Sequence, residues 1–340
     1  MCTSSTKVGT THQYRPRNAS HLNGFTLIEL LISLVVGSIL LLALNSLVGQ
    51  GLQTYDTVNG GDALNRQARF AMEQMVHAVS HSRQLLLPLN DNPATNWPEH
   101  IREETVPPSP PVGDSVGASA VLAVIQDRSL DLDRDGIPDA DQDGDGRIDE
   151  DPPSDLTNDQ SPGIYLVDDD GDGLVDEGGN PADDDESSGV SGEDPQNGLD
   201  DDGDVSTDED PDNDLNLDGC PGFCGVDDDR DGLVDESVAE DDDEDGVSGE
   251  DWLDPLVFYL ENGTLMQRSP VPWDESGSGG VTGRDFITEA LAENVSRMRV
   301  ERLPLTDGRA VQVELILELS DPVTGDSVSL ETRVRVGSAL

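Results

Sequence analysis

The chain of 340 residues has few aromatic, basic and cysteine side chains. Aromatic residues make up 4% of it and hydrophobic residues 34%, which indicates less packed structure than this length usually holds. Lysine and arginine together number 19 against 72 aspartates and glutamates, and the formal net charge is −53. Such a charge repels nucleic acid and anionic lipid headgroups, so we expect no nucleic-acid binding by the acidic part of the chain.

Residues that usually carry catalysis are also scarce. Only five histidines occur, and we find no HExxH motif, no phosphate-binding glycine loop and no serine, histidine and aspartate set. His77 and His81 stand four residues apart on a predicted helix and could share a metal, but no third ligand is evident. We interpret them as surface histidines and expect no enzymatic activity.

One long apolar run, residues 25–48, contains a single formal charge, Glu29. A helix of 24 residues at about 1.5 Å per residue crosses a hydrocarbon core of ~30 Å. A carboxylate in such a segment is costly in lipid and therefore marks a functional site. An ordinary single-pass anchor that happens to carry an acid is the alternative interpretation.

The start of this run, Gly24-Phe25-Thr26-Leu27-Ile28-Glu29-Leu30, closely resembles the processing signature of type IV prepilins and type II secretion pseudopilins. The resemblance implies that residues 1–24 are a leader that a prepilin peptidase removes between Gly24 and Phe25, and that Phe25 is then N-methylated. It places Glu29 at the fifth mature position, where it pairs with the terminal amine of an adjacent subunit. An ordinary secretory signal differs, because its cleavage site follows the apolar region.

The same resemblance implies a location and a set of partners. The apolar helix would hold the protein in the inner membrane as a single pass with the head outside the cytoplasm, and the protein would then enter a pilus or pseudopilus filament. The expected partners are the prepilin peptidase/methyltransferase, other pilins or pseudopilins, and the inner-membrane assembly platform.

The cysteines agree with such a compartment. Cys2 lies in the leader, which leaves the C-x3-C pair Cys220 and Cys224. On the oxidising side of the membrane this spacing favours a small-loop disulfide, and two free thiols are the alternative. A zinc site would need two more ligands, and no histidine lies nearby.

We expect an α+β fold: a pilin-like long N-terminal transmembrane helix and an antiparallel β-sheet head, with a large acidic calcium-loop insertion. Residues 49–87 carry apolar positions at helical spacing and predict an amphipathic continuation of the helix, with a break at Asn59-Gly60-Gly61 and an end at Pro88. Residues 88–130 predict a loop and then the first strand of the head, at 121–125.

The C-terminal part, residues 252–340, is predicted to be rich in strands. Asn262-Gly263 between two apolar runs predicts a hairpin. Short apolar or alternating segments predict further elements, namely strands at 164–167, 295–303, 311–319 and 328–336 and a short helix at 287–291. The order of elements resembles the PilW and GspJ class of minor pilins and pseudopilins, over roughly residues 62–87 and 256–336.

Residues 131–251 hold 48 acidic residues against three arginines, a net charge of −45. Acid richness alone predicts a solvated spacer, but the pattern D-x-D-x-D-G-x-x-D occurs four times. Calcium loops need oxygens at positions 1, 3 and 5 and glycine at position 6, where the chain turns around the ion. Hard oxygen ligands favour Ca²⁺ over transition metals. The predicted ligands are Asp131, Asp133, Asp135, Asp139, Asp141, Asp143, Asp145, Asp149, Asp168, Asp170, Asp172, Asp176, Asp227, Asp229, Asp231 and Asp235.

These loops depart from an EF-hand at position 12, where the bidentate glutamate is missing. They resemble thrombospondin type 3 or dockerin-like calcium repeats. Two further units are degenerate: the one at 200–204 lacks the glycine, and the one at 241–246 reaches Gly249 where an aspartate is expected. An acidic spacer that associates weakly with cations is the alternative interpretation.

Together these features predict a minor pilin whose head is stabilised by Ca²⁺, because a bulky acidic head suits a low-copy position better than a densely repeated one. A type II secretion pseudopilin is an alternative. Another is a filament-tip adhesin whose calcium-loaded insertion contacts a ligand.

Overall fold

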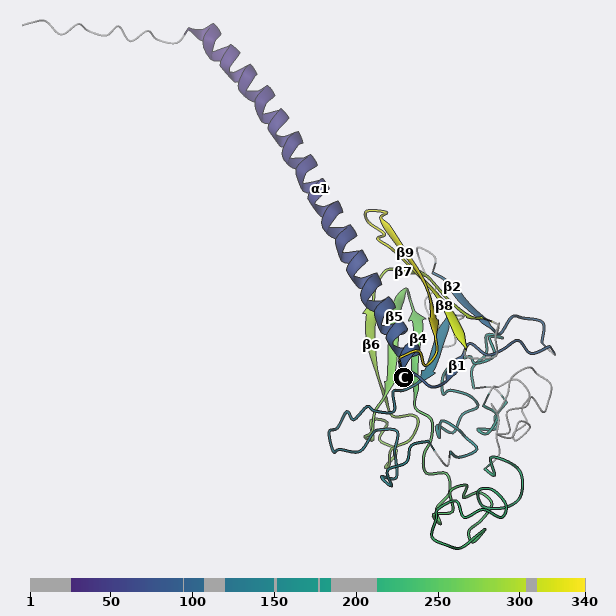
Figure 1. The fold of residues 1–340 in the computed structure, drawn as a ribbon. Coiled ribbons are helices and arrows are strands. Elements are labelled where there is room, and N and C mark those ends of the chain that lie inside the picture. Colours follow the sequence, from purple (N-terminus) through teal and green to yellow (C-terminus); the bar gives the residue numbers. More distant parts are fainter. Residues whose placement is uncertain are drawn as a thin grey trace, which may run out of the picture. The chain divides into compact units, whose positions relative to one another are not determined.

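A computed structural model describes residues 26–93, 95–106, 120–149, 152–176, 178–184, 213–303 and 311–339. These residues form one helix, α1, and nine strands, β1 to β9, all in antiparallel sheets, so the fold is α+β (Figure 1). The chain divides into two compact units, Met1–Asp56 and Thr57–Leu340. Helix α1 contributes residues to both.

In the first unit, α1 (Leu27–His81) begins with a reciprocal cap. The Glu29 carboxylate accepts hydrogen bonds from the Thr26 N–H at 3.0 Å and the Thr26 hydroxyl at 2.9 Å, which satisfies an amide that a helix start leaves without a partner. The apolar side chains of this part are open to the surroundings; Leu27 and Leu42 are 81% and 70% exposed. Among the described residues, no helix combines the length and apolar character needed to cross a membrane.

Two predictions about the helix are wrong. It continues through Asn59-Gly60-Gly61 without a break, and it ends at His81, before Pro88. The end is fixed by tertiary contacts: the carbonyls of Val79 and Ser80 accept hydrogen bonds from the N–H groups of Gly337 and Ala339, near the C-terminus. Backbone groups at the end of α1 thus find partners outside the helix.

The second unit contains two antiparallel sheets. One has the order β1-β3-β4-β5-β6 and the other β2-β7-β8-β9. The strands of the first are Leu85–Leu87, Val121–Ile125, Pro255–Glu261, Thr264–Pro270 and Phe286–Ala292. Those of the second are Ile101–Thr105, Val295–Leu303, Gln312–Ser320 and Ser327–Arg335.

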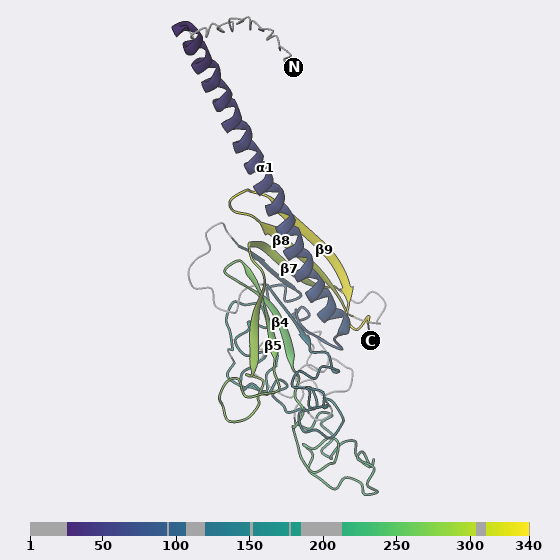
Figure 2. The same ribbon diagram turned by 90° about the vertical axis from the view of Figure 1, so that its left-hand side faces the viewer.

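The core of this unit forms where the second half of α1 packs against both sheets (Figure 2). The predicted apolar face of the helix is buried; Ala68, Met75 and Val79 are at most 1% exposed. They share one cluster with side chains of both sheets, among them Phe258 of β4 and Leu315 of β8. Burial of this face, at about 25 cal/mol per Å² of apolar surface, stabilises the C-terminal half of the helix.

Most predicted strands are confirmed, to within a residue or two at their ends. The Asn262-Gly263 hairpin is confirmed too, and both residues have positive φ, 51° and 78°, as a type I′ turn requires. Residues 287–291 are not helical but lie in β6, because they pair with β5. Intrinsic helix propensity is weak and tertiary pairing overrides it.

Two other segments differ from the prediction. Residues 164–167 form turns, although Ile164 and Val167 are buried against the sheet as an apolar pair. Strand β2 lies in the predicted loop after Pro88, and β1 precedes it, so the strand at 121–125 is the third of the head and not its first. The sequence of β2 is largely charged, and it is an edge strand whose pairing with β7 supplies its order.

The acidic insertion is a loop between two neighbouring strands. Ile125, the last residue of β3, pairs with Pro255, the first residue of β4, and the Gln126 N–H donates to the Asp254 carbonyl at 2.9 Å. Residues 126–254 thus begin and end side by side at one end of this sheet. Within them, the described residues contain turns and bends but no helix or strand, as the prediction of non-EF-hand loops requires.

Candidate calcium loops

The Asp131–Gly136 loop shows a hydrogen-bond pattern that organises its carboxylates. The Gly136 N–H donates to Asp131 Oδ2 at 3.2 Å and closes the turn. The Asp135 N–H donates to Asp133 Oδ1 at 3.0 Å, and the Ile137 N–H donates to Asp135 Oδ1 at 2.8 Å. Each of the three carboxylates at positions 1, 3 and 5 is therefore fixed by a backbone amide.

The same three bonds recur in the loops that begin at Asp141 and Asp168. The loop at Asp227 has the second and third bonds. Glycine is needed at position 6 because the backbone there is left-handed: φ is 98° at Gly136, Gly146 and Gly232 and 93° at Gly173. The repeated pattern thus has a repeated local geometry.

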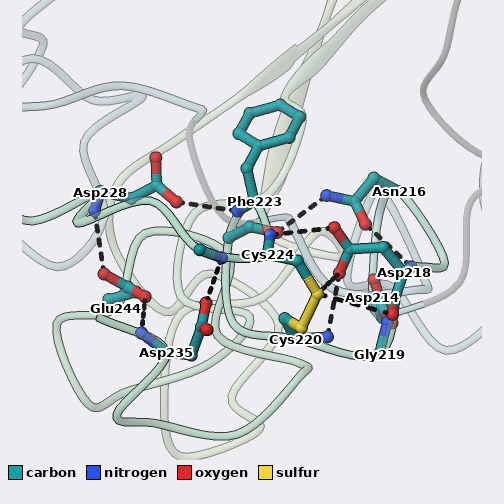
Figure 3. Close-up of a disulfide and its surroundings, with 12 residues drawn as sticks. Asp214, Asn216, Asp218, Gly219, Cys220, Phe223, Cys224, Asp228, Asp235 and Glu244 are labelled. Carbon is teal, nitrogen blue, oxygen red and sulfur yellow. Dashed lines mark hydrogen bonds between the residues drawn. A yellow bond between two sulfur atoms is a disulfide. The ribbon is translucent and has the colours of Figure 1, made fainter.

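The structure also contains a loop that the sequence analysis missed, Asp214–Gly219 (Figure 3). Its pattern is D-x-N-x-D-G, and Asn216 takes the place of the second aspartate. The Gly219 N–H donates to Asp214 Oδ2 at 2.9 Å, and the Asp218 N–H donates to Asn216 Oδ1 at 2.9 Å. Asparagine supplies an oxygen ligand as aspartate does, so allowing it at position 3 would have found this loop.

Cys220 and Cys224 form a disulfide directly after this loop. The amides of both cysteines donate to the two carboxylate oxygens of Asp218, at 2.9 Å from Cys220 and 3.0 Å from Cys224. Two residues of neighbouring loops extend this network. The Asp228 carboxylate accepts a hydrogen bond from the Phe223 N–H at 2.8 Å, and the Asp228 N–H donates to the Glu244 carboxylate. The disulfide therefore lies among the acidic loops and not in the β-sheet head.

The unit at Asp241, classed as degenerate from its sequence, folds like the intact ones. The Gly246 N–H donates to Asp241 Oδ2 at 2.8 Å, and the Asp245 N–H donates to Asp243 Oδ1 at 3.2 Å. The absence of an aspartate at position 9 does not prevent this turn, because the first six residues, the last of which is the glycine, determine it.

Several of these loops leave a carboxylate oxygen suited to a cation. In four of them, the Oδ1 atom of the first aspartate is buried and has no hydrogen-bond partner: Asp131, Asp214, Asp227 and Asp241. A buried anion oxygen without a donor is costly. Carboxylate oxygens also converge within 4.8 Å of one another in the sets Asp131, Asp133, Asp139 and Asp168, Asp170, Asp172. The donors are hard oxygens, so these residues fit Ca²⁺.

Other predicted ligands lie elsewhere. Asp149 forms ion pairs of 2.9 Å with both Arg83 and Arg128, and the set that includes Asp141 and Asp143 is completed by the distant Asp251. Asp176 Oδ1 accepts from the Leu166 N–H at 2.8 Å, and Asp235 Oδ1 accepts from the Gly225 N–H at 2.8 Å. The aspartate at position 9 of a loop thus often accepts a hydrogen bond from the backbone of a neighbouring turn.

Three carboxylates of these loops, Asp139, Asp141 and Asp170, hold their protons more tightly than free aspartate does. Burial, with smaller contributions from the charges of Asp172 and Asp168, raises the pKa of Asp170 to about 6. Burial likewise raises the pKa of Asp139 and Asp141, with smaller contributions from the neighbouring carboxylates of their loops. A divalent cation would remove this repulsion.

Arginines of the head contact one part of the insertion. Arg102 of β2 is 1% exposed and donates to the Asp169 carbonyl at 2.9 Å, with its guanidinium 3.5 Å from Asp168 Oδ2. Arg284 lies over the ring of Tyr165 at 4.3 Å. These contacts attach the segment around residues 165–169 to the two sheets.

The predicted processing residues, Gly24 and Phe25, lie outside the described residues. Residues 21–45 match the model of the prokaryotic N-terminal methylation motif. This match indicates a type IV pilin-like or pseudopilin-like protein, a class that is processed by prepilin peptidase and enters filaments with other pilins. No curated protein and no solved structure matches the chain.

Proposed function

We propose that this protein is a minor pilin: a subunit that prepilin peptidase processes, that residues 25–48 hold in the inner membrane, and that then enters an extracytoplasmic filament. The observation that carries the proposal is the methylation motif over residues 21–45, at the head of a helix whose second half is built into an α+β head. The role is assembly, not catalysis.

The exposed apolar start of α1 supports this role. Leu27, Leu34 and Leu42 are 81%, 65% and 70% exposed, and in water such a surface is unfavourable. Lipid covers it before assembly and the helices of neighbouring subunits cover it afterwards. Glu29 then pairs with the terminal amine of an adjacent subunit, because two opposite charges in an apolar core must pair or be strongly destabilising.

We further propose that the insertion binds Ca²⁺ and that the ion stabilises the head. The observations in support are the recurring amide-to-carboxylate bonds and the buried Oδ1 atoms of Asp131, Asp214, Asp227 and Asp241. The aspartates at positions 1, 3 and 5 would hold the ion, and the ion would supply the positive charge that this part of the chain lacks.

A filament-tip binding module is the second candidate. The acidic loops carry exposed apolar side chains, among them Phe223 at 62% and Leu233 at 56%, which would suit contact with another surface. A type II secretion pseudopilin shares every feature above and differs in the machine that recruits it.

Processing and assembly can be tested with two substitutions. In cells that carry the filament system, Gly24→Ala should leave the leader attached, which mass spectrometry of the N-terminus detects. Glu29→Ala should be processed normally but lose incorporation into purified filaments by at least tenfold. Normal cleavage of Gly24→Ala would exclude the processing site, and undiminished incorporation of Glu29→Ala would exclude the pairing role.

A further inference from the structure

The two ends of the acidic insertion meet in space. The loop Asp141–Gly146 lies shortly after β3, and the segment Asp241–Asp251 lies shortly before β4, about a hundred residues later in the chain. Asp251 Oδ1 accepts from the Gln142 N–H at 2.7 Å, and Asp251 Oδ2 accepts from the Asp149 N–H at 3.1 Å. The backbone of the first end is thus held by a carboxylate of the second.

Carboxylates from both ends converge on the same small volume. Oxygens of Asp143, Asp245 and Glu250 lie within 4.8 Å of one another, and so do oxygens of Asp141, Asp143 and Asp251. Asp143 belongs to both sets and therefore lies between them. The Arg147 guanidinium pairs with Asp243 and lies 3.6 Å from Asp145 Oδ2. Neither of these carboxylates belongs to the two convergent sets.

A buried oxygen at this place needs a ligand. Asp241 is 0% exposed, and its Oδ2 accepts from the Gly246 N–H and from the Ser237 hydroxyl. Its Oδ1 is buried without a hydrogen-bond partner. Asp241 is the first residue of the turn that carries Asp245, so this oxygen is available on the same loop that reaches across to Asp143.

We propose that Asp143, Asp245 and Glu250, with Asp241 on the same turn as Asp245 and Asp251 next to Glu250 in the chain, form a calcium site shared by the two ends of the insertion. This inference rests on the proposed calcium binding and goes beyond it, because each loop of a simple repeat would bind its ion alone. The shared ion closes residues 141–251 into a ring at its base, next to the paired ends of β3 and β4. Cross-linking a loop of this length removes much conformational freedom from the unligated chain.

The hard oxygen donors select the ion. No nitrogen or sulfur donor belongs to either convergent set, and the side chains come from turns of two segments that are distant in the chain. Ca²⁺ accepts such irregular oxygen sets, whereas Mg²⁺ demands near-ideal geometry and keeps its water. Excess Mg²⁺ should therefore compete poorly.

Hydrogen exchange on the full chain in detergent tests the link between the ends. In the wild type, Ca²⁺ should slow exchange in both 141–149 and 241–251 relative to chelator. Glu250→Gln should return 141–149, a hundred residues away, to its rate in chelator, and Asp143→Asn should do the same to 241–251. Calorimetry should show that each variant loses one Ca²⁺ and that the double variant loses no more than either alone.

Asp133→Asn is the matched control, because Asp133 lies in the neighbouring loop and in a separate set of carboxylates. Its loss of binding should add to that of Glu250→Gln. Protection lost only in the mutated segment, or additive losses for Asp143 and Glu250, would overturn the shared site while leaving calcium binding intact. A wild type that binds no Ca²⁺ would instead overturn the proposed calcium function as well. If Glu250→Gln does not fold in chelator, Asp143→Asn provides the reciprocal measurement.

Discussion

At the scale of single residues, the aspartates of this protein include some that pair with arginine and others whose buried oxygen atoms have no partner. Asp149 is neutralised by Arg83 and Arg128, and the segment at Asp168 is held by Arg102. Asp131, Asp214 and Asp227 have no such partner for their buried Oδ1 atoms. The few arginines of the chain thus fix particular positions of the insertion on the head, and the proposed Ca²⁺ would neutralise the remaining carboxylates.

Asp254 allows a test of this balance by pH. Burial, with smaller contributions from the charges of Asp149 and Asp139, raises its pKa to about 8. An acid with a higher pKa in the folded state than in the unfolded state binds its proton more tightly when folded. Its contribution to stability is therefore present below pH ~4 and is lost as the pH rises toward 8, by up to about 1.4 kcal/mol per pH unit.

We accordingly expect Asp254→Asn to raise the thermal midpoint at pH 7.5 in chelator and to have little effect at pH 4. Asparagine keeps an oxygen for the bond that Asp254 Oδ2 accepts from Gln142 at 2.9 Å. Thermal unfolding of both proteins across this pH range measures the difference, with the exposed Glu289→Gln as control. An equal gain at both pH values would contradict a buried, proton-binding carboxyl.

At the scale of elements, α1 shows how packing decides a helix. Asn59-Gly60-Gly61 favours a break, yet the helix continues through it, because the following turns bury Leu64, Ala68 and Ala71 in the core. Glycine in a helix interior lowers its stability relative to alanine, but burial of the apolar face outweighs that cost.

Substituting Gly61 tests the continuous helix. A Cβ added at Gly61 meets nothing within 4 Å, and its φ is not positive, so Gly61→Ala should stabilise the protein by about 0.5–1 kcal/mol. Gly173→Ala is the matched comparison, because space is equally open there but φ is 93°. Gly173→Ala should destabilise the Asp168–Gly173 loop instead. Thermal unfolding with and without Ca²⁺ separates the two, and a loss of stability in Gly61→Ala would indicate a broken helix.

At the scale of the whole molecule, the insertion is a very long hairpin loop that also covers one face of a sheet. Its Ile164 and Val167 pack against Val121, Val257 and Tyr259. The largest core cluster, which joins α1 to both sheets, contains none of the described residues of the insertion. The part of the molecule that the proposed filament role requires is thus separate from the acidic loops.

Deleting residues 131–251 and joining the ends with Asn-Gly should therefore leave a folded head that still enters filaments. We expect a lower thermal midpoint, because Val121, Val257 and Tyr259 lose their cover, and a midpoint that no longer responds to Ca²⁺. Circular dichroism, thermal unfolding with Ca²⁺ or chelator, and immunoblots of purified filaments measure these effects. A folded variant that is absent from filaments would show that the insertion takes part in assembly.

Local features, whose residues are close together in the chain, could be predicted from the amino-acid sequence. The methylation motif, the amphipathic face of α1, the Asn262-Gly263 turn and the D-x-D-x-D-G loops each depend on spacing within one continuous segment, so a pattern suffices to find them. The loop that begins at Asp214 shows the limit of such a pattern, since it has Asn216 where the pattern requires an aspartate and was therefore not found.

Features that depend on partners distant in the chain could not be predicted in this way and became visible in the folded protein. Charged β2 becomes a strand because β7 pairs with it, and α1 ends at His81 because Gly337 and Ala339 bind its last carbonyls. The ends of the insertion meet because β3 and β4 pair, which brings Asp143 to Glu250. No local pattern encodes these contacts, since they arise from the packing of segments that are far apart in the chain.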